Sequence, residues 1–240
     1  MNILALESSA GAASVALVRD EFLVAQSFQN TGLTHSRTLM PMVEDLLKNT
    51  ETTLAEIDLI AVAAGPGSFT GLRIGVSAAK GLAWAADKPC CAVSTLEAMA
   101  WTAAHMRGQL CPAMDARRGQ VYNARFESVD GIPRRLTPDR AISLEELAEE
   151  IRGAGSPPQL VLGDGWQLSR DYLSQRDIKV LLPPPHLRWQ TAWGVARGAL
   201  EMARAGKTVT AGELTPQYHR LSQAERERLE KNKEGSDHGR

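Results

Sequence analysis

A glycine-rich segment, GPGSFTG over residues 65–71, has the residue types that binding of a phosphate group would require. Glycine tolerates positive φ and close backbone approach, and the helix expected after this segment would direct free N–H groups and its positive end toward an anion. We therefore expect a nucleotide or phosphate site that includes Gly65, Gly67, Ser68 and Gly71. A tight strand-to-helix turn with Ser68 as the helix cap explains the same residues without a ligand.

The common nucleotide and metal motifs are absent from the sequence. No GxxxxGK[ST] motif occurs, and the glycine segment misses the GxGxxG spacing by one residue, while Pro66 lacks an N–H donor. The five histidines have no paired ligand spacing, and the three cysteines do not form a CxxC pattern. The sequence therefore predicts no metal site, and it offers no ligands for a metallopeptidase.

The composition is that of a globular protein without a strong electrostatic field. The 240 residues include 27 basic and 28 acidic side chains, for a net charge of -1, and 43% are hydrophobic. A net charge near zero gives no general attraction for polyanions, so we expect this chain alone to bind nucleic acids poorly. The sequence lacks a signal peptide pattern and a membrane-span pattern, and its cysteines suit reduced thiols, which together indicate a cytoplasmic protein without membrane contact.

Strands and helices alternate along the chain as expected for a mixed sheet covered by helices. In the first half, hydrophobic periodicity predicts strands at 2–7, 14–19, 22–27, 58–64 and 89–93, and helices at 33–48, 69–86 and 94–106. In the second half it predicts strands at 110–115, 120–127 and 159–162, helices at 143–152 and 191–205, and a further helical segment after the turn at 163–165. Ser94 with Glu97 has the spacing of a capping box, which explains Glu97 without a catalytic role.

These elements divide into two lobes and a tail. We expect residues 1–107 to form an N-terminal lobe that holds the glycine loop, and residues 108–187 to form a C-terminal lobe. Residues 188–222 are expected to return and pack between the lobes. Residues 223–240 are almost all charged or small, so they have too little apolar surface to order alone, and we expect a disordered tail.

Five segments together resemble the TsaB (YeaZ) family, which are TsaD-like paralogues in bacterial tRNA threonylcarbamoyladenosine biosynthesis. The segments are ILALESS at 3–9, GPGSFTGLRIG at 65–75, VSTLEAMA at 93–100, MDARRGQVY at 114–122 and PQYHR at 216–220. The resemblance implies the two-lobed actin-like ATPase fold (ASKHA, ribonuclease H-like), an α/β fold with a mixed five-stranded sheet flanked by helices in each lobe. It also implies a non-catalytic dimerisation and activating subunit of the complex that attaches a threonylcarbamoyl group to N6 of the adenosine next to the tRNA anticodon.

The resemblance also implies how this chain departs from catalytic relatives. TsaD-like proteins carry a pattern resembling HxxxH where this chain has Thr95 to Met99, and a hydroxyl and a thioether are poor ligands for an iron or zinc site. Actin-like ATPases use an Asp in the first hairpin to organise magnesium around nucleotide phosphates, and the comparable Glu7 is one methylene longer. The resemblance therefore adds Glu7 and Ser8 to the expected nucleotide site, with weak binding and no efficient turnover.

Two helices are expected to carry the contacts with a partner protein. Helix 69–86 is apolar or small on almost every face, and the resemblance implies that it forms a helical bundle with TsaD together with helix 33–48. The candidate contacts are Leu39, Met42, Val43, Leu46, Leu72, Val76 and Ala79. Burial of these side chains inside their own lobe is the alternative.

The resemblance further implies recruitment of the TsaE ATPase, so that ATP is used by the complex while this chain has no cofactor of its own. The tRNA would be met indirectly through the complex, and Arg117 and Arg118 fit either phosphate contacts or a solvated hairpin tip. Pairing of the isolated chain with itself stays open. The rival function is a stand-alone actin-like ATPase or small-molecule kinase, which the glycine loop would serve.

Overall fold

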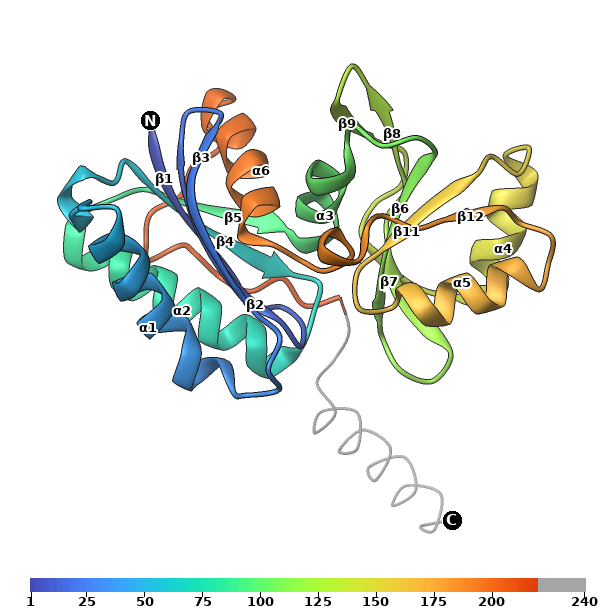
Figure 1. Cartoon of the computed structure of the whole chain (residues 1–240), viewed down its shortest axis with the longest axis horizontal. Helices are drawn as coiled ribbons and strands as arrows, with labels where there is room; N and C mark the ends of the chain where they lie inside the picture. The colour runs from blue at the N-terminus through green and yellow to red at the C-terminus, as the bar shows by residue number, and fades with distance from the viewer. Residues whose placement is uncertain (220–240) are drawn as a thin grey trace, which may run out of the picture.

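The computed structural model describes residues 1–219, which form two β-sheets side by side, each flanked by helices (Figure 1). The tail expected over 223–240 lies outside the described residues, as do residues 220–222 of the expected return segment. No helix within residues 1–219 is long and apolar enough to cross a membrane.

The first sheet has five strands in the order β3-β2-β1-β4-β5. They are β1 (Asn2–Glu7), β2 (Ala13–Arg19), β3 (Phe22–Gln29), β4 (Leu59–Gly65) and β5 (Cys90–Ser94), which confirms the five strands predicted for this half. The sheet is mixed, because β1 pairs antiparallel with β2 and parallel with β4. Alternate side chains enter opposite cores, with Leu4 and Leu6 on one face and Ile3 and Ala5 on the other.

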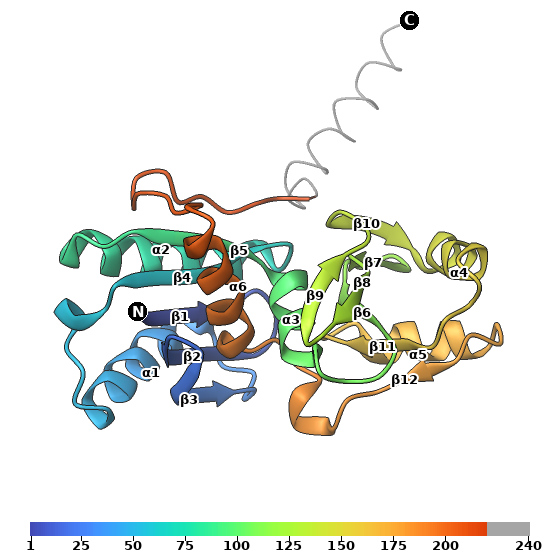
Figure 2. The same ribbon diagram turned by 90° about the horizontal axis from the view of Figure 1, so that it is seen from above.

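Helices cover both faces of the first sheet. α1 (His35–Asn49) and α2 (Phe69–Ala86) lie next to each other on one face, and α6 (Ala192–Arg204) lies on the other (Figure 1). Seen from above, α6 lies in front of the strands (Figure 2). Each helix turns its apolar side toward the sheet, so both faces of the central strands are buried. Short 3-10 turns, η1 (Leu54–Glu56) and η2 (Pro185–Leu187), occur in connecting segments.

The second sheet has seven strands, two more than the resemblance implied. Its main path is β10-β7-β6-β11-β12, and β8 and β9 extend from β6 as a hairpin. The strands are β6 (Gln109–Asp115), β7 (Gln120–Asn123), β8 (Phe126–Val129), β9 (Ile132–Arg135), β10 (Arg140–Ser143), β11 (Gln159–Leu162) and β12 (Val180–Leu181). Its helices, α4 (Leu144–Gly153) and α5 (Trp166–Ser174), pack in one core with it.

The single strand predicted over 120–127 is wrong, because the chain changes partners in the middle of this range. β7 pairs with β6 and β10, whereas β8 touches β6 only at Leu110 and Phe126 and then pairs with β9. At the break, the Arg125 N–H leaves the ladder and donates to Thr137 Oγ1 at 2.8 Å. Two short strands therefore replace one long strand.

α3 (Thr95–Ala103) lies between the two sheets and packs against elements of both lobes (Figure 1). On one side it meets α6, where Gly194 leaves room for the Ala98 carbonyl group. On the other side it shares a core with Leu110 of β6. A continuous apolar contact thus joins the lobes here, and the helix ends at Ala103, three residues before the predicted end.

Candidate functional site

A cleft of about 470 Å³ lies between the two sheets, next to the glycine loop. Segments that are far apart in the sequence line it, namely the β1–β2 turn at 9–11, the start of α2 at 67–69, the β6–β7 turn at 115–117, and residues 217–219. Asp164, which follows β11, adds a carboxylate from the second lobe. The cleft therefore presents hydroxyl, aromatic, carboxylate and guanidinium groups that neither lobe supplies alone.

The glycines of the loop make room for the β1–β2 turn. A side chain at Gly71 would overlap the Ser8 carbonyl oxygen, and one at Gly67 would overlap the backbone of Ser9. This close approach lets the Ser68 N–H donate to the Ser9 carbonyl oxygen at 2.7 Å. Ser68 also accepts a hydrogen bond from the Gly71 N–H at 3.4 Å, which confirms its predicted role as the cap of α2. These glycines serve close packing within the chain.

Residues 214–219, which we call the C-terminal strap, run across the outside of the glycine loop. Leu214 is buried in the first core and anchors the strap. The Gln217 N–H donates to the Ala64 carbonyl oxygen at 2.7 Å. The Gln217 carbonyl oxygen lies against Gly65, where a Cβ would overlap it. Gly65 also has a φ of +136°, so both the contact and the backbone conformation require glycine. The strap therefore fixes the exit of β4.

An aromatic stack holds the end of the strap on α2. The rings of Tyr218 and Phe69 lie 4.8 Å apart between centroids, and the Arg73 guanidinium lies 3.9 Å from the Phe69 centroid. Arg73 Nε also donates to the Tyr218 hydroxyl at 3.0 Å. The first turn of α2 is thus covered on this side by the chain itself.

Two carboxyl groups near the cleft have raised pKa values. Glu7, at the end of β1, is fully buried, and this burial raises its pKa from 4.5 to about 7, with the charge of Asp164 adding to the shift. Its Oε1 accepts a hydrogen bond from the Ser9 N–H at 2.6 Å, and Oε2 has no partner among the described residues. Burial raises the pKa of Asp164 from 3.8 to about 6. A hydrogen bond from the Gln190 side chain to Asp164, at 3.0 Å, lowers the pKa and offsets part of this shift. Glu7 is therefore partly protonated at neutral pH.

The structure separates the six residues predicted for a nucleotide site into two groups. Two of them line the cleft, Gly67 and Ser68. The other four are buried beneath its wall, namely Glu7, Ser8, Gly65 and Gly71. The Ser8 hydroxyl, for example, donates to the Gly71 carbonyl oxygen at 2.9 Å. Most of the predicted set therefore contacts other parts of the chain and does not face the cleft.

Most residues that line the cleft were not among those predicted for the nucleotide site, for example Ser9, Asp164 and Tyr218. The motifs at 3–9, 114–122 and 216–220 each contain residues that line the cleft, but nothing in their spacing brings them to the glycine loop. Within residues 1–219, no group of three or more His, Cys, Asp or Glu side chains is arranged to hold a metal ion.

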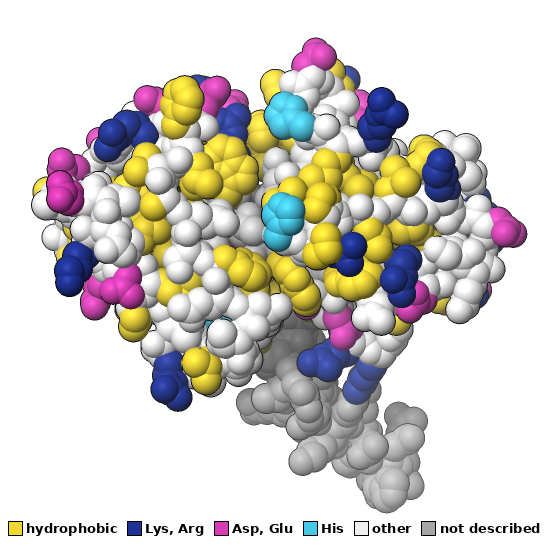
Figure 3. All heavy atoms as spheres, viewed as in Figure 1, with side chains coloured by type: hydrophobic (Ala, Val, Ile, Leu, Met, Phe, Trp, Pro, Cys, Tyr) yellow, Lys and Arg dark blue, Asp and Glu magenta, His cyan; other side chains and the backbone are white. Residues whose placement is uncertain are grey.

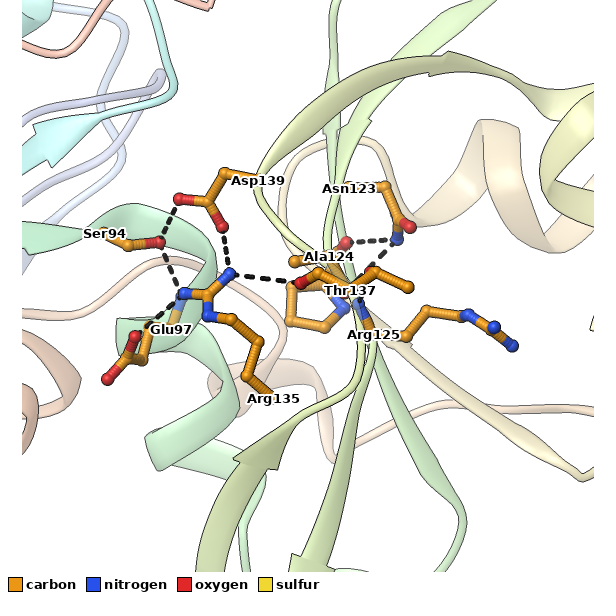
Figure 4. A network of polar contacts seen from close by, with 9 residues as sticks. Ser94, Glu97, Asn123, Ala124, Arg125, Arg135, Thr137 and Asp139 are labelled. Atoms are coloured by element: carbon orange, nitrogen blue, oxygen red, sulfur yellow. Dashed lines mark hydrogen bonds and ion pairs between the residues drawn. The ribbon is translucent and has the colours of Figure 1, made fainter. Parts of the chain in front are cut away.

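A network of polar contacts closes the start of α3 (Figure 4). Ser94 accepts a hydrogen bond from the Glu97 N–H at 3.2 Å and donates one to Asp139. Arg135 of β9 pairs with both Asp139 and Glu97, the latter at 2.8 Å. The predicted capping box is therefore wrong in its second half, because the Glu97 carboxylate binds Arg135 and does not return to the Ser94 N–H. The network ties the first lobe to the second.

Comparison with known proteins decides the family. The tRNA threonylcarbamoyladenosine biosynthesis protein TsaB of Bacillus subtilis (strain 168) is 34% identical over 236 residues, which are 97% of this chain and 100% of that protein. This chain belongs to the TsaB family. The family model described as TsaD, tRNA N6-adenosine threonylcarbamoyltransferase, matches residues 29–160, more than half of the chain. The resemblance carried by the sequence motifs is thereby confirmed.

Solved structures agree with membership of the TsaB family. YeaZ from Pseudomonas aeruginosa superimposes with a TM-score of 0.77 at 29% identity, over 90% of this chain and 99% of that one. Component A of the (R)-2-hydroxyglutaryl-CoA dehydratase of Acidaminococcus fermentans gives a TM-score of 0.51 at 12% identity, over 85% of this chain and 99% of that one. This second similarity concerns the fold alone. The expected two-lobed actin-like fold is confirmed.

The seven side chains predicted as partner contacts are buried within this member of the TsaB family. They are at most 5% exposed: Leu39, Met42, Val43, Leu46, Leu72, Val76 and Ala79. In the single chain six of them fill the space between the helix pair and the first sheet, while Leu72 is buried at the wall of the cleft. The outward side of α2 carries other residues, among them Ser77, Gly81 and Trp84, and Trp84 is 73% exposed.

Proposed function

We propose that this chain acts in tRNA threonylcarbamoyladenosine biosynthesis as a non-catalytic subunit in the cytoplasm. It pairs with a TsaD-type transferase, activates it, and helps to recruit the TsaE ATPase. The match to TsaB over nearly the full length of both chains carries the assignment to this process. Three features of the structure support the division of labour within the complex.

The first feature is the start of α3, where the resemblance implies metal-binding histidines in TsaD. Thr95 and Met99 are buried there, and Met99 packs in the core that joins the two lobes. Glu97, between them, is engaged by Arg135. Side chains that fill a core or an ion pair are not presented to a metal ion. This supports a subunit that leaves the transfer reaction to its partner.

The second feature is the glycine loop, which is occupied by other parts of the chain. The Ser68 N–H is bonded to Ser9, and Gly65 is covered by Gln217. Glu7, which the resemblance places at the magnesium position, is buried and has a pKa of about 7, and a protonated carboxyl is a poor magnesium ligand. We therefore propose that this chain binds nucleotide weakly and does not turn over ATP, which the complex uses through TsaE.

The third feature is the outward side of the helix pair formed by α1 and α2, which we propose as the surface for TsaD. Trp84 projects from α2 and is 73% exposed, and exposed aromatic side chains commonly anchor protein interfaces. A Cβ at Gly81, one turn earlier, would meet no atom within 4 Å. Packing within residues 1–219 does not require glycine at position 81, whereas Gly81 would allow another helix to approach closely.

We propose that tRNA is bound through the complex and only indirectly by this chain. Basic and acidic side chains are interspersed over the face shown in Figure 3, in keeping with the net charge of -1. Arg117 and Arg118 lie exposed at the tip of the β6–β7 hairpin. Two arginines would release few counterions, so their contribution to RNA affinity would be small without a partner.

Reconstituted tRNA threonylcarbamoylation tests this function, with TsaD, TsaE and a TsaC-type adenylate synthase, in the presence and absence of this chain. We expect modified tRNA only in the complete mixture, and no ATP hydrolysis by this chain alone. Saturable ATP hydrolysis by the chain alone, without complementation of the mixture, would instead favour the stand-alone ATPase or kinase.

The helix surface is tested by titrating TsaD with the variant Trp84→Ala. Removal of an anchoring tryptophan should weaken the complex at least about tenfold, which is about 1.4 kcal/mol. The matched control is Leu168→Ala, which removes an exposed apolar side chain from α5 in the second lobe and should leave the affinity unchanged. Equal affinities for both variants would move the contact to another face.

A further inference from the structure

A pocket of about 510 Å³ lies beside the C-terminal end of α2, at the opposite end of this helix from the cleft. One wall is the helix itself, including Ala83 and Trp84, and the other wall is the segment 208–213, which runs beside α2 (Figure 2). Lys80 Nζ of α2 donates to the Gly212 carbonyl oxygen at 3.2 Å and holds this segment in place. The pocket therefore continues the outward side of α2 that we propose as the surface for TsaD.

The end of α2 places a carboxylate in this pocket that the chain does not neutralise. Asp87 follows the helix with a φ of 51°, and its N–H donates to the Ala83 carbonyl oxygen. The C-terminal end of a helix carries a partial negative charge, so a cation is favourable there and a carboxylate is not. Within residues 1–219 the Asp87 side chain forms no ion pair and no hydrogen bond. A cation from another molecule would satisfy both the carboxylate and the helix end.

A second carboxylate lines the pocket from the other wall. Glu213 Oε2 accepts hydrogen bonds from the Thr210 N–H and hydroxyl group, at 2.9 and 2.8 Å, which lower the pKa of Glu213 and keep it ionised at neutral pH. Among the described residues of the lining, Lys88 alone carries a positive charge, and its Nζ donates to the Ala55 carbonyl oxygen at 2.8 Å. Two carboxylates against one engaged ammonium group leave the pocket negative.

We propose that this pocket binds an arginine side chain of the TsaD-type partner. A guanidinium group stacks on an aromatic ring, here that of the exposed Trp84, and it also pairs with a carboxylate such as Asp87. The apolar stem of an arginine suits lining residues such as Pro89 and Val209. An apolar side chain in this place would bury Asp87 without a cation, and an anion would meet two carboxylates. The inference rests on the proposed function and adds the chemistry of the partner's contact.

Titration of TsaD with the variant Asp87→Asn tests the charge. Asparagine tolerates the left-handed backbone of this position, so folding should be retained, which circular dichroism verifies. The affinity for TsaD should weaken at least about fivefold at low salt, and its dependence on NaCl concentration should decrease, because one ion pair is lost. Asp177→Asn is the matched control: Asp177 follows α5 in the second lobe with a φ of 58° and has no ion pair within residues 1–219. It should change neither quantity.

Double-mutant cycles then identify the residue on the partner. Exposed arginines of TsaD are changed to alanine one at a time, and each TsaD variant is titrated with the original chain, Trp84→Ala, Asp87→Asn and Asp177→Asn. We expect one arginine whose effect on affinity shrinks at least about fivefold in the Trp84→Ala and Asp87→Asn backgrounds, and stays unchanged in the Asp177→Asn background.

The inference is overturned if Asp87→Asn binds TsaD as tightly as the original chain, or if no arginine of TsaD couples to both Trp84 and Asp87. Either result, with Trp84→Ala still weakening the complex and tRNA modification intact, would leave the proposed function and its helix surface standing. Absence of modified tRNA from the complete mixture with the original chain would instead contradict the proposed function, and the inference with it.

Discussion

Two strand-to-helix junctions of the first sheet, β4 to α2 and β5 to α3, close the same kind of helix end in different ways. Both helices begin with free N–H groups and a serine cap, Ser68 in α2 and Ser94 in α3. At the first junction, the β1–β2 turn and the C-terminal strap lie directly against glycines. At the second junction, Arg135 and Asp139 from the other lobe close the end with side chains.

The comparison shows that a glycine loop before a helix in an actin-like fold can serve packing within the chain, without a bound ligand. The first junction depends on the absence of side chains, and the second depends on their presence. We therefore expect added side chains to damage the first junction and removed side chains to damage the second. Four predictions test this difference, in order of decreasing effect.

The largest effect is expected for Gly71→Leu at the first junction. The new Cβ would overlap the Ser8 carbonyl oxygen. Because this oxygen is part of the backbone, the overlap can be relieved only if the whole β1–β2 turn moves. We expect a loss of about 3 kcal/mol or more in the free energy of unfolding, measured by urea denaturation. Gly81→Leu in the same helix is the control, and it should be neutral or stabilising by up to about 1 kcal/mol because its Cβ meets no atom within 4 Å. Equal urea midpoints for the two variants would contradict the packing role of Gly71.

The second effect is a pH dependence from Glu7, which lies under the first junction. Its pKa is raised from 4.5 to about 7 by burial, so the folded chain binds this proton more tightly than the unfolded chain. The contribution of Glu7 protonation to the free energy of unfolding is fully present below about pH 4.5. It is lost as pH rises to about 7, by up to about 1.4 kcal/mol per pH unit. Asp164, with its pKa raised to about 6, adds to the lower part of this range.

Urea denaturation at several pH values between about 5 and 8 measures this dependence. Glu7→Gln should remove most of the slope near neutral pH, because the amide carries no charge to bury. Glu146→Gln is the control, since Ser143 lowers the pKa of the exposed Glu146 and its contribution has the opposite sign. An unchanged slope in Glu7→Gln would show that other groups cause the pH dependence.

The third effect belongs to the second junction, where Arg135→Ala removes the cation shared by Glu97 and Asp139. The carboxylate of Asp139 would remain nearly buried with the Ser94 hydroxyl but without a cation, so we expect a loss of about 1 to 2 kcal/mol in the free energy of unfolding. Arg134→Ala is the matched control, because its side chain is 69% exposed and its ion pair with Glu127 is long, at 3.6 Å. A loss as small as that of the control would mean that the lobes are held by the α3 core alone.

The smallest effect is expected for Tyr218→Ala, which removes the stack on Phe69 at the first junction. We expect a loss of about 1 kcal/mol, measured by urea denaturation. Tyr218→Phe is the control that keeps the ring and removes only the hydrogen bond from Arg73, so its loss should be smaller. If the two variants were equal, the hydroxyl and not the stack would hold the strap.

The sequence predicted the first lobe well because its elements follow local rules. α2 spans Phe69–Ala86, as predicted from its periodicity and its serine cap. β4 is a continuous apolar run that ends in glycine, which is typical of a central strand with both faces buried. Such signals lie within a few residues of one another, so they can be read without knowledge of distant contacts.

The second lobe was predicted less completely because its short strands depend on distant partners. β8, β9, β10 and β12 have two to four residues each, too few to show a clear alternation of apolar and polar side chains. β9, for example, reads IPRR, and β8 is the one strand that it pairs with among the described residues. Similarly, the Glu97 carboxylate forms an ion pair with Arg135 in place of the local capping hydrogen bond. The sequence around Glu97 does not show this, because Arg135 belongs to the other lobe.

The sequence by itself determined the family, the mixed first sheet and the glycine-dependent turn before α2, because each is written in contiguous residues. Only the tertiary structure decided which side of α1 and α2 is buried and which groups line the cleft. A small or apolar residue such as Val76 fits equally well against its own sheet or against a partner, and the choice is made by where the chain places its neighbours. The raised pKa of Glu7 has the same origin, because burial is a property of the assembled lobes.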